Sequence, residues 1–143
     1  MQRTLIIILA ILTTSVLYSQ KVTTFAIKLN GGMVVKPTTL PNNAAIEVEA
    51  KITTKRKLNT YHITITEPNP TKDWHRVYIC NDATGNELKR ITLKSTNAPC
   101  TFALPSTVTN FTLITMTQPN DPAAAATMRL RSFPLAHIQL INK

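Results

Sequence analysis

Apolar and polar side chains alternate along much of this chain, and this pattern constrains its fold more than any other feature. In residues 46–53 every second side chain is apolar, namely Ile46, Val48, Ala50 and Ile52. Successive side chains of a β-strand point to opposite faces, so this segment is predicted to be a half-buried antiparallel strand. Apolar residues at helical spacing are almost absent, which argues against a helical fold.

Further strands are predicted wherever a similar run lies between turn-forming residues. The predicted strands are residues 25–29, 33–36, 46–53, 61–66, 74–80, 88–94, 102–104, 111–117, 128–133 and 135–141. Strands at this spacing predict an all-β fold, a single antiparallel β-sandwich of about seven to nine strands with immunoglobulin-like or jelly-roll-like connections. Trp74 precedes both cysteines, so the Cys, Trp, Cys order of antibody-type domains is absent and only the architecture is predicted.

Local signals mark the connections between these strands. Asn30-Gly31-Gly32 predicts a tight hairpin, because these residues tolerate positive φ. Residues 37–43 are predicted to be a loop, and Pro134 is predicted to form a kink or bulge. Asp121 and Pro122 precede four alanines and predict one helical turn, with Asp121 as its N-cap.

The first nineteen residues, MQRTLIIILAILTTSVLYS, have the features of a secretory signal peptide. Arg3 supplies positive charge, and the apolar run at 5–17 is shorter than the roughly 20 residues that span a bilayer. We expect cleavage between Ser19 and Gln20, which divides the chain into a signal peptide at 1–19 and one β-sandwich domain at 20–143. The mature chain is then secreted, periplasmic or on the cell surface, without a transmembrane anchor. An uncleaved anchor and an ordinary buried strand are the alternatives for this segment.

Cys80 and Cys100 are the two cysteines of the chain. A pair in an exported protein is more often bridged than free, which favours a disulfide. In a plain meander, however, Cys80 ends one strand and Cys100 begins another at the opposite end of the sheet, whereas a disulfide needs Cα atoms about 4.4 to 6.8 Å apart. Both the bridge and two free thiols therefore stay open.

The chain carries a net charge of +9, which falls to +8 when Arg3 leaves with the signal peptide. Such a surplus favours anionic partners, although a solvated surface gives the same composition. By alternation several basic residues point outward, and they would form one basic face if their strands were neighbours. The predicted face contains Lys51, Lys55, Arg56, Lys57, Arg90, Lys94, Arg129 and Arg131. Specific nucleic-acid binding is not expected, because neither exposed aromatics among these charges nor a recognition helix is evident.

Residues 73–76, Asp-Trp-His-Arg, form the densest group of reactive and aromatic side chains. In a strand Trp74 and Arg76 share one face, where they would offer a stacking platform for a glycan, while His75 points the other way. The alternative is a core tryptophan with polar neighbours at the start of a strand.

Catalytic and metal-binding patterns are weak. Glu47 and Glu49 share a strand face, which a solvated surface explains as well as an acid pair. His62, His75 and His137 lie in different predicted strands without ligand spacing, so we assign no catalytic residue, metal or cofactor.

The sequence thus predicts a small exported, non-enzymatic protein that acts by binding or assembly, through a basic face that contacts anionic glycan, lipopolysaccharide or another surface polymer. One alternative is a structural subunit of a surface assembly that docks on another protein by edge-strand addition, with residues 20–29 or 138–143 as the donor. A hydrolase using Asp73, Glu47 or His75 is the third hypothesis.

Overall fold

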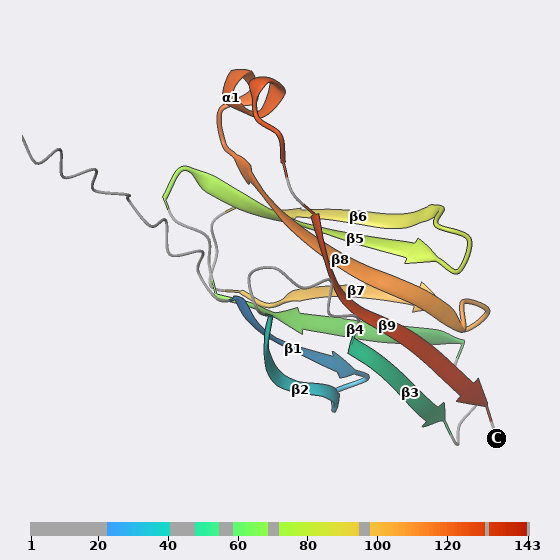
Figure 1. Ribbon diagram of the computed structural model, residues 1–143. Helices are drawn as coiled ribbons and strands as arrows, with labels where there is room; N and C mark the ends of the chain where they lie inside the picture. Colours follow the sequence, from blue (N-terminus) through green and yellow to red (C-terminus); the bar gives the residue numbers. More distant parts are fainter. Residues whose placement is uncertain are drawn as a thin grey trace, which may run out of the picture.

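A computed structural model describes residues 23–40, 48–54, 59–68, 72–94, 98–130 and 132–142. It contains two β-sheets that face each other in a sandwich-like arrangement (Figure 1). Sheet A has the order β2 (Gly32–Leu40), β1 (Thr23–Leu29), β4 (Thr60–Thr66), β7 (Cys100–Pro105). Sheet B has the order β3 (Val48–Thr54), β9 (Ser132–Asn142), β8 (Asn110–Pro119), β5 (Trp74–Asp82), β6 (Glu87–Leu93). The all-β prediction is confirmed, while the predicted signal peptide, with Ser19 and Gln20, lies outside the described residues.

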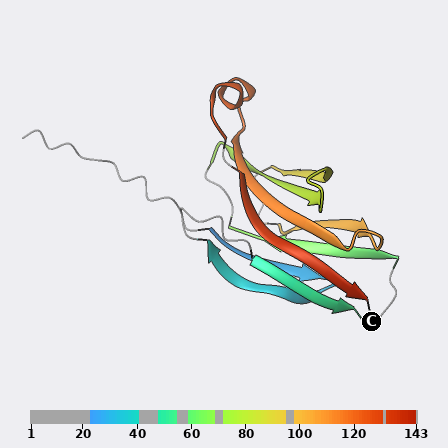
Figure 2. The ribbon, with the colours of Figure 1, turned by 45° about the vertical axis from the view of Figure 1, so that its right-hand side comes forward.

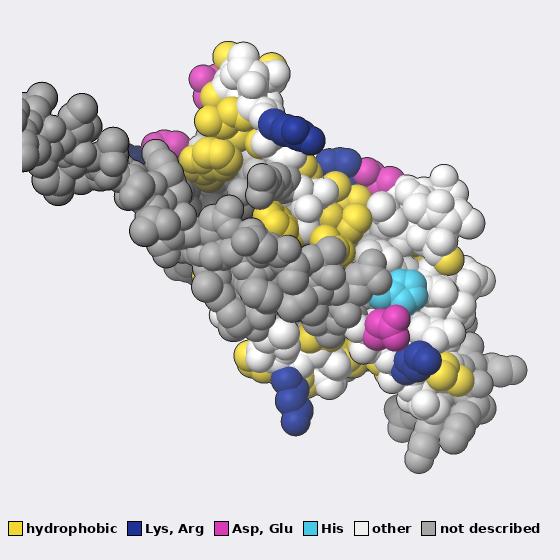
Figure 3. Space-filling model, in the orientation of Figure 1, with side chains coloured by type: hydrophobic (Ala, Val, Ile, Leu, Met, Phe, Trp, Pro, Cys, Tyr) yellow, Lys and Arg dark blue, Asp and Glu magenta, His cyan; other side chains and the backbone are white. Residues whose placement is uncertain are grey.

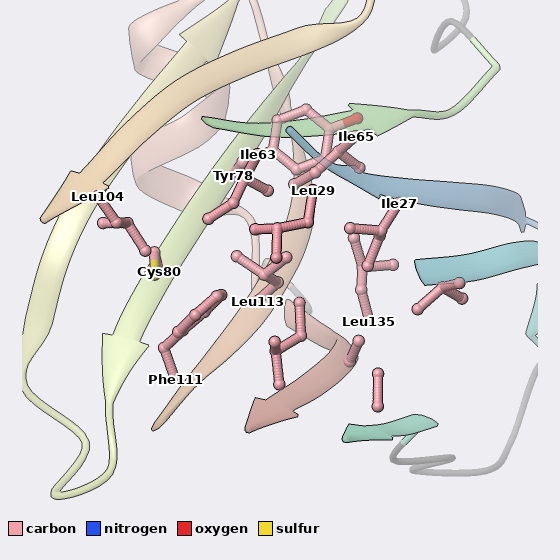
Figure 4. Packing of buried hydrophobic residues seen from close by; sticks show 14 of the residues in the cluster. Ile27, Leu29, Ile63, Ile65, Tyr78, Cys80, Leu104, Phe111, Leu113 and Leu135 are labelled. Atoms are coloured by element: carbon pink, nitrogen blue, oxygen red, sulfur yellow. The ribbon is translucent and has the colours of Figure 1, made fainter. Parts of the chain in front are cut away.

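The core fills the space between the two sheets, and it consists of the residues that alternation places on the inner faces. Tyr61, Ile63 and Ile65 of β4 are buried, whereas His62 and Thr66 between and after them are exposed. Figure 4 shows side chains of both sheets converging, among them Ile27 and Ile63 from sheet A and Tyr78, Phe111 and Leu113 from sheet B. Full burial of one such side chain contributes about 1.5 to 3 kcal/mol. This shared core is what joins the sheets.

The predicted hairpin at the start of the domain is confirmed. Asn30 and Gly31 have φ values of 48° and 82°, as a two-residue turn with positive φ at both central positions requires. The strand that follows is longer than predicted, because β2 continues through Pro37 to Leu40 instead of giving way to a loop. Proline lacks an N–H to donate, but β2 is an edge strand, where that loss is tolerated.

The strand β3 corrects the prediction that all strands pair antiparallel. Its alternation is as expected, since Ala50 is buried and Glu49 and Lys51 are exposed. However, it pairs in parallel with β9, from Val48 opposite Ala136 to Thr54 opposite Asn142. Alternation reports which face of a strand is buried and carries no information on the direction of its neighbour.

The C-terminal part contains one strand where two were predicted. Residues Met128–Leu130 are not in a strand, and β9 runs from Ser132 through Pro134 to Asn142. Leu113 faces Ala136 while Ile114 faces Pro134, so Leu135 is an extra residue on β9. This is the bulge predicted at Pro134, and it turns both Leu135 and Ala136 into the core.

The helix α1 (Pro122–Thr127) has the predicted cap, since the Asp121 side chain accepts a hydrogen bond of 3.0 Å from the Ala123 N–H. It projects beyond the sheets between β8 and β9 (Figure 1). Within the described ranges, no helix is long and apolar enough to cross a bilayer.

Both sheets are open. Two views place β2 and β3 together at one side of the sandwich and β6 and β7 at the other (Figures 1 and 2). Sheet B has one strand more than sheet A. Because β2 and β3 contact each other at the first side, the extra strand of sheet B falls at the other side, where β6 has no described counterpart in sheet A.

Candidate functional site

Among the predicted basic residues that the structure describes, Lys51 and Arg90 lie far apart. Lys51 and Arg90 both point outward from sheet B, but β3 and β6 are its two edge strands. Four strand spacings separate them, which is about 19 Å. On the face shown in Figure 3, basic side chains also appear at separate places rather than as one field. Lys55, Arg56, Lys57 and Arg131 lie outside the described residues, and exposed Arg129 follows α1.

The strand β6 provides the densest basic group of the described chain, which we call the β6 cations. It consists of Lys89, Arg90 and Lys94, all exposed. Arg90 is bound to Glu87 of the same strand by hydrogen bonds of 3.0 Å from Nε and 2.6 Å from Nη2. Lys89 was not among the predicted residues, because alternation assigns it to the inner face. It is exposed since β6 extends past sheet A.

The acidic residues are used mainly for local structure. Asp82 accepts hydrogen bonds from Thr84 and Asn86 in the turn between β5 and β6, and these bonds lower the pKa of its carboxyl, the Thr84 side chain most strongly. Asp121 caps α1, and Glu87 binds Arg90. The side-chain hydrogen bond from Arg90 likewise lowers the pKa of Glu87.

Most basic residues of the described chain, in contrast, have no acidic partner. Apart from the Arg76–Glu67 and Arg90–Glu87 pairs, the described part of the chain has no ion pair. The exposed cations without an acidic partner there are Lys28, Lys36, Lys51, Lys72, Lys89, Lys94 and Arg129. The positive surplus is therefore available to solvent and to a partner.

Arg76, predicted to share a glycan-stacking platform with Trp74, contacts Glu67 and the Pro68 carbonyl. Its Nη1 lies 2.8 Å from Glu67 Oε2, and Nη2 donates to the Pro68 carbonyl at 3.1 Å. The Arg76 side chain is only 11% exposed and that of Glu67 is 0% exposed. The guanidinium of Arg76 is therefore held mostly beneath the surface. The neighbouring Trp74 is half-buried at the start of β5.

The carboxylate of Glu67 is the most unusual charged group in the structure. Within the described residues, neither of its oxygens accepts a hydrogen bond of good geometry, although Arg76 is in ionic contact. Burial raises the pKa of Glu67, against the lowering effects of Arg76 and the nearby Thr115 and Tyr78 hydroxyls. Burial also raises the pKa of Tyr78, and the charge of Glu67 adds to the effect. These four side chains form a compact polar cluster inside an otherwise apolar core.

Little in the sequence predicts this cluster. Glu67 stands beside Pro68 at the predicted end of a strand, where an exposed acid is the usual expectation. A signal was present in Arg76 and Thr115, which occupy inward positions of β5 and β8. A basic residue at an inward position requires a buried acidic partner.

Of the two alternatives for the cysteines, the structure has the free thiols, since Cys80 and Cys100 are both free and buried. Cys80 faces Leu113 near the beginning of β8 in sheet B. Cys100 begins β7 in sheet A and lies close enough to Glu67 for that charge to influence it. The two thiols thus belong to different sheets, which pack about 10 Å apart, and to different levels of the core. Burial raises the pKa of Cys80 to about 12, and burial with Glu67 raises the pKa of Cys100 to about 11.

The three histidines occupy separate places. His75 Nδ1 lies 3.0 Å from Asn120 Oδ1, and His137 Nδ1 lies 3.1 Å from Thr112 Oγ1, while His62 is exposed on sheet A. Over the described ranges no three His, Cys, Asp or Glu residues are grouped so that they could hold a metal ion. Glu49 is exposed on β3, and Glu47 lies outside the described residues.

Asp73 adjoins His75 through the chain, and its backbone adopts a positive φ of 70°. Its carbonyl accepts a hydrogen bond of 2.8 Å from the Asn120 N–H. Asn120 therefore contacts both the Asp73 backbone and the His75 ring. These contacts link the beginning of β5 to the end of β8.

No family model, no curated protein and no solved structure matches this chain significantly.

Proposed function

We propose that this protein is a small exported, non-enzymatic β-sandwich that acts by binding an anionic surface polymer, such as an acidic glycan or lipopolysaccharide. The observation that carries the proposal is that most acidic side chains of the described structure have partners, whereas most basic side chains do not. Glu67, Asp82, Glu87 and Asp121 are engaged in ion pairs, a turn and a helix cap, whereas most of the cations have no acidic partner in the described structure. A polyanion can meet such dispersed cations without a shaped pocket.

Export is part of the proposal. The strand β1 begins at Thr23, so cleavage between Ser19 and Gln20 would leave every described strand intact. Cells that express the full chain should release or display a protein whose first residue is Gln20. Recovery of intact chain with Met1 in the cytosol would contradict this part.

We propose an immunoglobulin-like connection as the finer fold assignment. The strands β1-β4-β7 correspond to A-B-E of that fold, and β9-β8-β5-β6 correspond to G-F-C-C′. The chain departs from the immunoglobulin pattern in its additional strands β2 and β3 and in its cysteines, which lie on β5 and β7 instead of the B and F positions. A jelly roll has less support, because two Greek keys of four strands do not describe this order.

Retention on heparin and on immobilised lipopolysaccharide tests the binding proposal. Each cation near an anionic surface contributes about 1 kcal/mol, so the loss of three of them should weaken retention about 100-fold, and their reversal should weaken it further. Lys51→Glu, Lys89→Glu and Lys94→Glu change three exposed cations on or next to sheet B, and Lys55, Arg56 and Lys57 form a second set. Added salt should weaken the retention of the unmodified protein, because exposed charges are screened.

Lys28→Glu and Lys36→Glu on sheet A provide the matched control. If binding depends on the sheet B cations, the control variant should keep most of its retention. Retention that is insensitive to salt and to both sets of reversals would refute polyanion binding.

Edge-strand donation from a terminus, the alternative function, has less support. The donor 20–29 overlaps β1, which is paired on both sides by β2 and β4. The donor 138–143 overlaps β9, which is paired by β3 and β8. Either segment would have to leave its sheet before it could dock elsewhere.

A further inference from the structure

The strand β7 differs from the other edge strands because it carries no charge. Edge strands usually hold charged residues that discourage pairing with another chain. The edge strand β2 contains Lys36 with Pro37, β3 contains Glu49 and Lys51, and β6 contains Lys89 and Arg90. By contrast, residues 98–107 around and within β7 contain no charged side chain.

The hydrogen bonds of β7 identify which of its backbone groups are free to pair. The Ser106 N–H donates to the Asn59 carbonyl at 3.0 Å, which extends the β4–β7 ladder by one residue pair. Hydrogen-bonded pairs of an antiparallel ladder recur at every second residue, so Cys100, Phe102 and Leu104 face β4 with their backbone groups. The N–H and C=O groups of Thr101 and Ala103 therefore point away from β4, toward a side on which no described strand lies.

The inner face of β6 lies beside the open edge of β7. The inner face of β6 carries Ile91 and Leu93, which are only half-buried, and the exposed Lys89. An additional strand beside β7 would lie opposite these side chains, since β6 is the strand of sheet B that has no counterpart in sheet A. It would cover Ile91 and Leu93 with apolar side chains and would place another side chain near Lys89.

We propose that β7 is a docking strand for an extended segment of a partner protein, which adds to sheet A and carries apolar residues and one acidic residue on its inward face. The acidic residue meets Lys89, and the apolar residues meet Ile91 and Leu93. This inference does not depend on polymer binding, because it rests on backbone pairing at β7.

A second copy of this chain fits the same edge less well. Pairing of two β7 strands would bring a charge-free strand to Lys89 and would leave its charge without a partner. It would also bring the β6 cations of the two copies toward each other, at a range where exposed charges still repel. Self-association is therefore an outcome that the experiment must be able to detect.

Synthetic peptides of about nine residues, a typical strand length, test the proposal. The probe alternates threonine with inward-facing valine, isoleucine and glutamate, and two versions place the glutamate near either end. Addition to β7 should slow amide hydrogen exchange of Thr101 and Ala103 at least about tenfold, because both N–H groups become hydrogen-bonded. A matched peptide with lysine in place of glutamate should bind at least about tenfold more weakly.

Two variants locate the site. Ala103→Pro removes an outward N–H without touching the bonds to β4 and should abolish peptide binding, while Ala103→Ser should keep it. Lys89→Glu is an exposed change that leaves folding intact, and it should reverse the preference toward the lysine peptide. Ala103→Pro should not alter retention on heparin, so the docking inference and the polymer proposal fail separately.

Three results would overturn the inference. One is no binding of either glutamate peptide. Another is binding that leaves exchange at Thr101 and Ala103 unchanged. The last is protection of these amides that rises with protein concentration alone, which would assign the edge to a second copy of the chain.

Discussion

Two carboxylate–guanidinium pairs in this molecule have nearly the same separation and entirely different surroundings. Arg76 and Glu67 are 2.8 Å apart with side chains 11% and 0% exposed, while Arg90 and Glu87 are 2.6 Å apart with side chains 47% and 42% exposed. In the low-dielectric interior the loss of one charge leaves the other uncompensated, whereas water replaces a lost partner at the surface. Burial, more than the distance between the charges, therefore decides how much an ion pair affects the free energy of unfolding.

The largest effect is expected from removal of the buried cation. Arg76→Met should lower the free energy of unfolding by about 3 to 5 kcal/mol at neutral pH, because Glu67 is left buried without its counter-charge. Chemical denaturation followed by intrinsic fluorescence measures this change.

The double variant Glu67→Gln with Arg76→Met is the control for the Arg76→Met prediction. It should recover most of the lost stability, because it removes both charges at once. An Arg76→Met protein as stable as the unmodified chain would show that Glu67 is not enclosed.

The pH dependence of stability distinguishes the buried pair from the exposed one by its sign. Burial raises the pKa of Glu67 above its ordinary value of 4.5, so the folded state holds that proton more tightly than the unfolded state. The contribution of Glu67 is therefore greatest below pH 4.5 and is lost as pH rises through the raised pKa. The lowered pKa values of Asp82 and Glu87 act in the opposite direction.

Comparison with Glu67→Gln isolates this contribution, because Asp82 and Glu87 are present in both proteins. The free energy of unfolding of the variant should increase relative to the unmodified chain as pH rises from 4.5. A gain for the unmodified chain over the same range would mean that the attraction of Arg76 outweighs desolvation.

The two thiols report on the neighbourhood of the buried pair. Cys100 is influenced by Glu67, whereas burial alone raises the pKa of Cys80. Both thiols should resist an aromatic disulfide reagent in the folded protein and react after denaturation without reductant. Arg76→Met should speed the reaction of both thiols, because a less stable protein opens more often and exposes them. Failure to find two thiols after denaturation would establish a disulfide.

Most strands and turns followed from the sequence, because each depends on neighbours along the chain. Alternation located Tyr61, Ile63 and Ile65 in the core, and Asn30-Gly31 located the first hairpin. The parallel partner of β3 and the position of Cys100 relative to Cys80 depend on how distant strands are ordered, which local patterns do not encode. The separation of Lys51 and Arg90 depends on strand order in the same way, since they occupy opposite edges of sheet B.

The smallest effect is expected at the exposed pair. Glu87→Gln removes a partner of Arg90 that water replaces, so the unfolding midpoint should stay within experimental error of the unmodified chain. The same substitution frees the Arg90 guanidinium and adds to the net charge, so retention on heparin should increase slightly. A marked loss of stability would show that the exposed pair holds the β5–β6 hairpin together. The difference in effect between this pair and the Glu67–Arg76 pair would then have to come from local geometry instead of from exposure to solvent.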